Sequence, residues 1–537
     1  MSEWWKSAVC YQIYPRSFQD SNADGIGDLD GITRRLDYLN DGTPTSLGVD
    51  AIWLSPTFPS PMKDFGYDVS DYVGVDPMFG DLDAMDRLIV AAHERGIRVL
   101  LDYVPNHSSD LHPWFLDSRS SRTAAKRDWY VWRDAKPDGS PPNNWISNFG
   151  GPAWTWDEGT GQYYLHSFLR EQPDLNWRNP EVVAAMHDVL RFWLARGIDG
   201  FRVDVMGMVM KDPAMPDEAL NPNWHEGMLP YERLIHSATL NYPDVFDVVR
   251  DIRSQIDEFP HRMAVGEVFG PPEVLTKYLG GEALDGLHLA FNFNLLAENS
   301  VYTPWEAREI RRIVTDYERE LVAGAQPCYA LNNHDRSRFV SRHMDDGRGH
   351  ERGRAAALLL LGLRSTPFLY QGEELGMVDV RIPENMQQDP ARFHSEGRDP
   401  VRTPMQWDAS PGFGFTTGTP WLPFGADSFN AEAQRNDPDS MLALYRDAIW
   451  QRKAHGALAH GTLSDVTSVE DTFVFVREAE GEGDRPVLVA INTATEAREI
   501  PLPTWASSML LCSLRHLDGQ AVSGTLRLPG LAGAWVE

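Results

Sequence analysis

Short runs of apolar residues alternate along this chain with longer segments in which apolar side chains recur every three or four positions. The runs lie at 8–14, 49–55, 97–104, 198–204, 263–268, 287–293, 328–333 and 366–372. Continuous apolar runs bounded by Gly, Pro and polar residues are typical of strands buried on both faces of a parallel sheet. The pattern therefore predicts eight parallel strands.

Helical periodicity fills the segments between these strands, most clearly at 82–96 and 181–197. The second segment closes with Arg196 and Gly197, and a basic last turn followed by glycine is a common helix end. Strands that alternate with helices form parallel sheets, and eight such units close into a barrel. We therefore expect an α/β fold, a (β/α)8 TIM barrel.

The alternation is interrupted once and changes once. From 105 to 174 the helical period is lost and Trp, Pro, Gly and Asn are frequent, which predicts an inserted loop-rich domain B after the third strand. From about 461 to 537 short runs of alternating polarity predict a C-terminal β-sandwich. The barrel then occupies residues 1–104 and 175–460. A long insertion at the carboxyl ends of barrel strands usually shapes the pocket.

Composition narrows the class of protein. No apolar stretch approaches the ~18 residues that span a bilayer, and the N-terminal segment lacks the apolar core of a signal peptide. Cys10, Cys328 and Cys512 have no CxxC spacing, which indicates reduced, buried thiols. The formal charge of −29 argues against nucleic acid or membrane as a partner. We expect a globular, cytoplasmic protein that is a monomer or a small homo-oligomer.

Three acids end apolar runs: Asp204, Glu267 and Asp335. They stand in GFRVDV (200–205), AVGEV (264–268) and LNNHD (331–335). Because barrels place their chemistry at the carboxyl ends of their strands, one pocket should hold all three acids. Arg202 shares a face with Asp204, and its charge should keep that carboxylate ionised, whereas Glu267 in its more apolar run should hold a proton. Retaining cleavage of glycosides requires such a pair of carboxyl groups.

At these motifs the sequence resembles the α-amylase family of glycoside hydrolases, in particular its α-glucosidase and oligo-1,6-glucosidase branch. The markers are DYVPNHSS (102–109), QPDLN (172–176), GFRVDV (200–205), GEV (266–268) and NNHD (332–335). The resemblance covers essentially the whole chain. It implies that Asp204 is the nucleophile, Glu267 the general acid/base, and Asp335 the residue that holds the sugar hydroxyls.

The resemblance also implies a group of substrate-binding residues around the triad. GYDVSDY (66–72) supplies a stacking platform and an acid, and GRDPVRTPMQWD (397–408) looks like the pocket-closing loop of this branch. The implied set is Asp68, Tyr67, His107, Phe149, Phe168, Gln172, Arg202, His334, Arg398 and Arg402. The substrates would be small α-glucosides, and no organic cofactor is expected.

A metal site is expected in DSNADGIGD (20–28), where oxygen-bearing side chains alternate as in a calcium loop. An EF-hand would need Glu at the position of Gly31, so the loop is not an EF-hand. The resemblance implies instead the small divalent-ion site of this branch, a structural site for calcium, with magnesium as the alternative. Its ligands would be Asp20, Asn22, Asp24, Ile26 and Asp28.

The sequence thus predicts a retaining, exo-acting α-glucosidase that releases α-glucose from the non-reducing end of isomaltose-, maltose-, sucrose- or trehalose-type substrates. The insertion and the 377–430 loop would close the space beyond the terminal glucose. Val205 favours α-1,6 linkages by resemblance, whereas 206–227 looks more like the broad bacterial α-glucosidases. Two alternatives stay open: an α-glucosyl-transferring isomerase or transglucosidase, such as a sucrose isomerase or trehalose synthase, and a non-catalytic binding relative.

Overall fold

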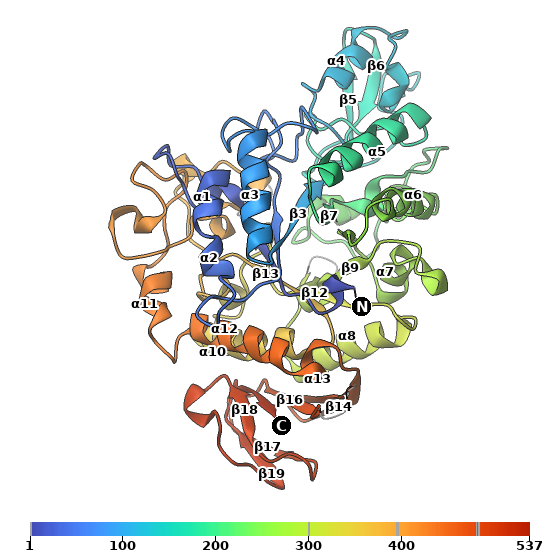
Figure 1. Ribbon diagram of the computed structural model, residues 1–537. Helices are drawn as coiled ribbons and strands as arrows, with labels where there is room; N and C mark the ends of the chain where they lie inside the picture. Colours follow the sequence, from blue (N-terminus) through green and yellow to red (C-terminus); the bar gives the residue numbers. More distant parts are fainter. Residues whose placement is uncertain (1–2, 299–300, 394–396, 480, 482–483) are drawn as a thin grey trace.

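A computed structural model describes residues 3–298, 301–393, 397–479, 481 and 484–537, and its centre is a closed barrel of eight parallel strands. In barrel order the strands are β1 (Cys10–Ile13), β2 (Ala51–Leu54), β3 (Arg98–Tyr103), β7 (Gly200–Val203), β8 (Met263–Gly266), β9 (Leu289–Asn292), β12 (Cys328–Ala330) and β13 (Thr366–Tyr370). Each strand lies inside one of the predicted apolar runs. The predicted (β/α)8 barrel is confirmed (Figure 1).

Helices surround the barrel and connect its strands. The longer ones are α3 (Leu82–Glu94), α5 (Pro180–Ala195), α6 (Val245–Asp257), α7 (Pro272–Tyr278), α8 (Ala307–Glu320), α10 (Gly349–Gly362) and α12 (Met441–Ala454). Helix α5 begins where the Asn179 side chain accepts a hydrogen bond from the Glu181 amide. It ends before Gly197, whose φ of 107° turns the chain back towards β7 as the sequence predicted.

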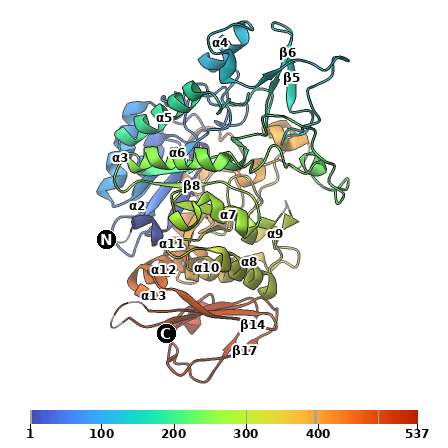
Figure 2. The same ribbon diagram turned by 90° about the vertical axis from the view of Figure 1, so that its right-hand side faces the viewer.

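Within the predicted insertion, the chain forms the helix α4 (Pro113–Ser120) and a small antiparallel sheet. The sheet has the strand order β4-β6-β5, with bounds β4 (Trp132–Arg133), β5 (Trp154–Asp157) and β6 (Gln162–Leu165). Figures 1 and 2 show this part at one end of the barrel and the C-terminal strands at the opposite end. The insertion therefore follows the carboxyl end of β3, where it can reach the ends of the other strands.

The C-terminal part is a β domain, as predicted. Its five-stranded sheet runs β14 (Leu463–Val469), β15 (Thr472–Arg477), β16 (Val487–Asn492), β20 (Gly533–Val536) and β18 (Met509–Cys512), beside a pair formed by β17 (Arg498–Pro501) and β19 (Thr525–Leu528). Successive side chains of β15 point to opposite faces of the sheet. Phe473 and Phe475 therefore pack into the barrel core, whereas Val474 and Val476 belong to a separate core of this domain. Trp535 donates to the Leu358 carbonyl at 3.0 Å and ties the sheet to α10.

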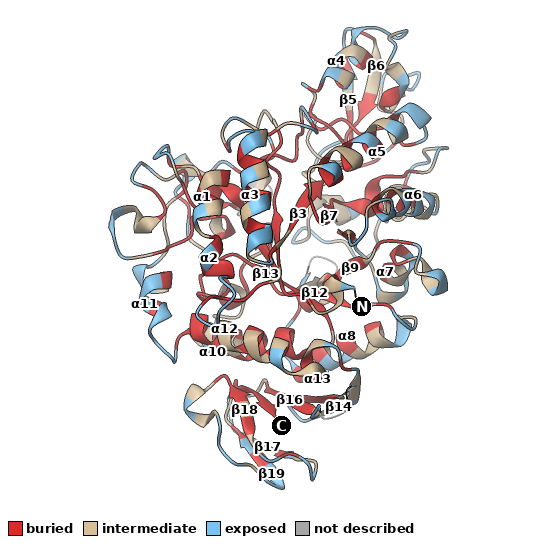
Figure 3. Ribbon diagram, viewed as in Figure 1, coloured by how far each residue is buried: buried red, intermediate tan, exposed pale blue. Residues whose placement is uncertain are grey.

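Burial follows this architecture. The barrel strands are buried along their length, and the helices that surround them expose their outer faces (Figure 3). Cys10, Cys328 and Cys512 are buried free thiols. Within the described ranges, no helix combines the length and the apolar composition that crossing a membrane requires.

Candidate active site

One guanidinium group connects the ends of three neighbouring strands. Arg202 lies on β7, and only 3% of its side chain is exposed. Its Nη1 donates to Asp102 Oδ1 at 2.6 Å and to Asp204 Oδ1 at 2.7 Å. Its Nη2 donates to Glu267 Oε2 at 2.6 Å. Since Asp102 lies in β3 and Glu267 directly follows β8, the predicted meeting of Asp204 with Glu267 occurs around a shared arginine.

Each of the two predicted catalytic carboxyl groups has one oxygen held and one oxygen free. The Arg202 fork takes Oδ1 of Asp204 and Oε2 of Glu267. From the residues described, no hydrogen bond reaches Oδ2 of Asp204 or Oε1 of Glu267. A fixed fork with two hydrogen-bonded carboxylates is a rigid arrangement, because Arg presents its donors in a plane. The free oxygens are the ones available for a substrate.

The charge balance of this cluster differs from the sequence prediction. Burial raises the pKa of Asp204 well above its ordinary value; Arg202 opposes that shift, but Glu267, Asp102 and Asp335 add to it. Burial also raises the pKa of Asp102 to about 6 against the effect of Arg202. The expectation that Arg202 keeps Asp204 ionised was therefore wrong in direction, because burial and three other acids together outweigh the effect of Arg202. The cluster has one cation for three acids and favours the retention of a proton.

A neutral imidazole lies beside the cluster. His334 stacks on Tyr67 with ring centroids 5.5 Å apart and planes 2° from parallel. Its Nε2 is 2.9 Å from the Tyr67 hydroxyl and 3.3 Å from Asp335 Oδ2. Burial lowers the pKa of His334 to about 3, so the ring is neutral near pH 7. Tyr67 also donates to Asp102 at 3.2 Å and thereby joins the imidazole to the Arg202 cluster.

Asp335 has a different environment from Asp204. Its side chain is 27% exposed, and its Oδ1 accepts from Arg402 Nη2 at 2.9 Å and from Arg398 Nη1 at 3.2 Å. Burial would raise the pKa of Asp335, but His334 and the two guanidinium groups hold it well below its ordinary value. Arg402 also donates to the His334 carbonyl at 2.8 Å. Asp335 is therefore a fixed anion at the edge of the cluster.

Arg398 joins three segments that are far apart in the sequence. Its Nη2 donates to Asp64 Oδ1 at 2.6 Å and to Asp389 Oδ1 at 2.8 Å, and its Nη1 reaches Asp335. Its Cζ lies 5.3 Å from the centre of the Phe149 ring. Phe149 belongs to the insertion and Arg398 to the 377–430 loop, so the two segments meet here.

Asp68 does not belong to this network in the predicted way. It is fully buried, and its carboxylate accepts bonds from the Ser60 hydroxyl and from the Lys63 and Asp64 amides, each at 2.9 Å. Burial raises the pKa of Asp68 to about 6. The structure corrects the expectation for this residue: Asp68 holds the 60–64 turn, and Asp64 is the acid that contacts Arg398.

The remaining predicted residues form the other side of the site. Gln172 Nε2 is 3.1 Å from both Asp64 Oδ2 and His107 Nε2. The His107 ring lies 5.1 Å from Phe168, which lies 6.0 Å from Phe149. Burial lowers the pKa of His107 to about 4 and keeps its ring neutral near pH 7. Apart from Asp68, the predicted catalytic and substrate-binding residues are linked by these contacts into one network.

Three acids of the network were missed by the sequence analysis: Asp64, Asp102 and Asp389. Asp102 opens DYVPNHSS, and its place two residues before the end of a strand-like run was a usable signal. Asp64 stands four residues before Asp68, and the sequence offered no means to choose between them. Asp389 lies in a segment without periodicity, where its pairing with Arg398 could not be inferred.

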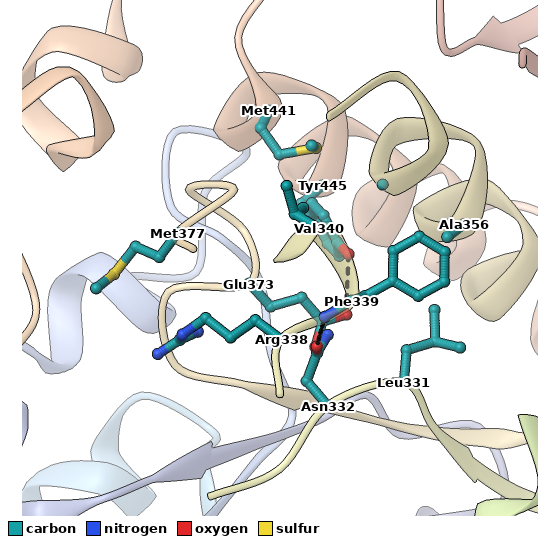
Figure 4. Close-up of a pocket in the computed structure, with 11 residues that line it drawn as sticks. Leu331, Asn332, Arg338, Phe339, Val340, Ala356, Glu373, Met377, Met441 and Tyr445 are labelled. Atoms are coloured by element: carbon teal, nitrogen blue, oxygen red, sulfur yellow. Dashed lines mark hydrogen bonds between the residues drawn. The ribbon is translucent and has the colours of Figure 1, made fainter. Parts of the chain in front are cut away.

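A small cavity lies behind the segment that carries His334 and Asp335. Its volume is about 10 Å³, enough for about one water molecule, and Asn332, Glu373 and Tyr445 supply polar groups around it. The Phe339 amide donates to Asn332 Oδ1 at 2.5 Å, and the Tyr445 hydroxyl donates to Glu373 at 2.9 Å (Figure 4). Buried polar bonds thus fix the loop that follows β12.

The predicted metal loop is a series of tight turns. Asp20 accepts four bonds, from the Asn22, Ala23 and Gly25 amides and the Thr416 hydroxyl, which occupy the four lone-pair sites of a carboxylate. Asp24 and Asp28 accept fewer bonds and keep free sites. Across the residues described, no group of three or more His, Cys, Asp or Glu is arranged to hold a metal ion. Asp20 can therefore bind a cation only if one of these four hydrogen-bond donors moves away.

Comparison with known proteins places this arrangement in a family. The model of the alpha-amylase catalytic domain matches residues 12–461. A probable alpha-glucosidase of Rhizobium meliloti is 44% identical over 517 residues, which is 93% of this chain and 91% of that protein. An oligo-1,6-glucosidase of Heyndrickxia coagulans is 40% identical, with 92% of each chain covered. The crystal structure of the alpha-glucosyl transfer enzyme XgtA is 39% identical and superposes with a TM-score of 0.92 over 100% of this chain and 99% of that one.

The buried neutral ring of His334 predicts acid sensitivity. Its pKa falls from an ordinary ~6.5 to about 3 in the fold, so its contribution to stability is complete above pH ~6.5 and is lost as the pH falls towards 3. Between pH 6.5 and 5 the loss should be about 2 kcal/mol. Urea unfolding should show that the free energy of unfolding depends less steeply on pH in His334→Gln than in wild type. The matched control His460→Gln, at an exposed position, should keep the wild-type slope. Equal slopes for His334→Gln and wild type would contradict the neutral ring.

Proposed function

The chain belongs to the α-amylase family, and we propose from this premise that it is an α-glucosidase that cleaves small α-glucosides with retention of configuration. The observation that carries the proposal is the Arg202 fork, which holds one oxygen of Asp204 and one of Glu267 and leaves their partner oxygens free. Two carboxyl groups fixed side by side are what a double-displacement glycosidase requires.

In the first half-reaction, Oδ2 of Asp204 attacks the anomeric carbon of the terminal glucose. Glu267 gives its proton to the glycosidic oxygen, which takes the electron pair of the breaking C–O bond. The products of this step are a glucosyl ester of Asp204 and the free alcohol. The Arg202 charge supports this step, because it opposes the upward shift of the Asp204 pKa and so favours the ionised nucleophile.

In the second half-reaction, Glu267 accepts a proton from a water molecule, and the water oxygen attacks the anomeric carbon of the ester. The C–O bond to Asp204 breaks, and Asp204 recovers its carboxylate. Two successive inversions give α-glucose. Arg202 contacts both carboxyl groups throughout, so it can stabilise whichever of them is ionised.

Asp335 and its neighbours are proposed to bind the terminal glucose. An ionised carboxylate at the edge of the cluster can accept hydrogen bonds from sugar hydroxyls that strengthen as positive charge develops on the ring. His334 and His107 are neutral and can donate to hydroxyls, and Arg398 presents donors beside Asp64. Tyr67 offers an aromatic ring, stacked on His334, for the sugar face.

Exo action is supported by the contact between the insertion and the 377–430 loop. Phe149 lies beneath Arg398, and Arg398 is bonded to Asp64 and Asp389. We propose that this junction lies beyond the terminal glucose, where a longer glucan would have to pass. The site should therefore accept chain ends and short substrates.

Transfer of glucose to a second sugar is the second candidate function, because this chain is similar over its whole length to XgtA, an alpha-glucosyl transfer enzyme. Water and an acceptor sugar would compete for the same ester on Asp204. For linkage, we propose isomaltose-type substrates on the basis of Val205 and of the similarity to an oligo-1,6-glucosidase.

We propose that this enzyme is cytoplasmic, because its three cysteines are buried free thiols. Cell fractionation that recovers the activity outside the cell would overturn the placement.

The test of the proposed function is product analysis with isomaltose, maltose, sucrose and trehalose. We expect proton NMR to show α-glucose as the first product, with short substrates cleaved much faster than starch or dextran. Asp204→Asn should lower kcat by at least about three orders of magnitude on every substrate. β-Glucose as the first product would refute retention, and isomerised disaccharides without glucose would favour the transferase.

The roles of Asp64 and Asp68 can be separated by a matched pair of variants. Asp64→Asn weakens the contacts with Arg398 and Gln172 in the binding site, and we expect it to lower kcat/KM by at least about tenfold, the effect of one charged hydrogen bond. Asp68→Asn should mainly lower the melting temperature, because its carboxylate holds a buried turn. The reverse outcome would restore Asp68 as the sugar-binding acid.

We also propose that the 20–28 loop binds calcium when Asp20 exchanges the Thr416 hydroxyl for the ion. Asp24 and Asp28 retain free acceptor sites that support the proposal. Saturating calcium should stabilise the fold by about 2–3 kcal/mol at a hundredfold excess over Kd, seen as a higher melting temperature. Asp24→Ala should abolish the effect, and Asp212→Ala, which removes an acid from another exposed turn, should not. No calcium or magnesium in undialysed protein would refute the site.

A further inference from the structure

Val205, directly after Asp204, has an unusual backbone conformation. Its φ is 35° and its ψ is 44°, in the left-handed region, and the residue is buried. A β-branched residue rarely adopts this conformation, because its side chain crowds the backbone there. Such strain persists where surrounding contacts over-determine it, and it is concentrated at functional sites. The contacts around Val205 show what this conformation achieves.

The hydrogen-bond ladder between β7 and β8 is displaced by one residue at Val205. Val203 pairs with Gly266, and the Glu267 amide donates to the Val203 carbonyl at 2.8 Å. In a regular parallel ladder the next bond would run from the Val205 amide to the Glu267 carbonyl. Instead, the Met206 amide donates to that carbonyl at 3.0 Å. The left-handed turn at Val205 thus inserts one residue and frees an amide from the ladder.

The freed amide has a definite partner. It donates to Oε2 of Glu267 at 3.1 Å, the same oxygen that accepts from Arg202 Nη2 at 2.6 Å. Two donors on Oε2 leave no favourable place for a proton there, because a hydroxyl hydrogen would face two other hydrogens. The proton of the Glu267 carboxyl group must then be carried by Oε1, the oxygen without a partner among the described residues.

We propose that Val205 is a positioning residue for proton transfer: its displaced backbone amide fixes the Glu267 carboxyl group so that Oε1 carries the proton and faces the leaving group. The proposal rests on the proposed function, in which Glu267 is the general acid. It concerns the amide of Val205 and not its side chain. With Arg202 alone, the carboxyl group could pivot about the single bond to Nη2, and the amide removes that freedom.

Replacement of the Val205 amide by an ester tests the proposal. Incorporation of the α-hydroxy acid analogue of valine removes the N–H and keeps the side chain. With an activated aryl α-glucoside, whose leaving group needs little protonation, kcat/KM, which reports the first half-reaction, should change by less than about threefold. With isomaltose, or whichever disaccharide is cleaved best, kcat should fall at least about tenfold while KM stays within about threefold.

Two matched controls separate this effect from general damage. The same ester at Met206 removes a bond to the Glu267 carbonyl and leaves its carboxyl group untouched, so both substrates should lose rate together. Val205→Gly keeps the amide and tolerates a positive φ, so the ratio of its rates on two aryl α-glucosides with a good and a poor leaving group, which do not differ in linkage, should stay within about twofold of wild type. A Val205 ester that slows both substrates equally, or neither, would overturn the proposal.

Glu267→Gln distinguishes failure of this inference from failure of the proposed function. If Glu267→Gln does not spare the kcat/KM of the aryl glucoside, which reports the first half-reaction alone, Glu267 is not the acid and the proposed function fails. If Glu267→Gln spares it and the Val205 ester does not, only the inference fails. Should the ester protein not fold, a crystal structure with a non-hydrolysable thio-disaccharide decides: the sulfur should lie within ~3.5 Å of Oε1, and a sulfur facing Oε2 would overturn the proposal.

Discussion

The site depends on one interaction, the contact of a single guanidinium with carboxyl groups from three strands. Arg202 can reach Asp102, Asp204 and Glu267 together only because β3, β7 and β8 are parallel neighbours in register. Asp102 pairs with Arg202 across the first interface, and Val203 pairs with Gly266 across the second. A one-residue slip of either strand would turn the acid to the other face of the sheet. The closed barrel therefore serves as the frame that sets the spacing of the charges.

Such a cluster is costly to bury, and the rest of the molecule compensates for it. Burial raises the pKa of Asp204 and of Asp102. Repulsion from neighbouring carboxylates adds to both shifts, because three acids surround one cation. Removal of one partner from a buried ion pair typically costs about 3–5 kcal/mol, because the other charge is left without compensation. The Trp53 indole and the Tyr67 hydroxyl supply further donors to Asp102. The strained backbone at Val205 belongs to the same arrangement and is held by bonds on both sides of it.

The sequence was sufficient for the fold and for the centre of the site, and insufficient for the loops. All eight barrel strands were predicted, because a strand buried on both faces leaves a continuous apolar run. Asp204, Glu267 and Asp335 could be placed together because each follows such a run. Asp68 was expected from the resemblance alone, and no pattern in the sequence indicated that Asp64 is the acid that contacts Arg398. The direction of the pKa shift of Asp204 depends on its burial and on acids carried by three other strands, which no local pattern reveals.

The barrel strands and the loops contribute different parts of the proposed site. The barrel fixes only the carboxyl groups and Arg202, whereas the walls come from the insertion and from the 377–430 loop. These walls meet where Arg398 lies over Phe149 and binds Asp64, Asp389 and Asp335 at once. One arginine thus couples the wall of the site to the anion that would hold the sugar hydroxyls. A change in either loop that moves this junction would alter the walls of the site without touching the Arg202 cluster.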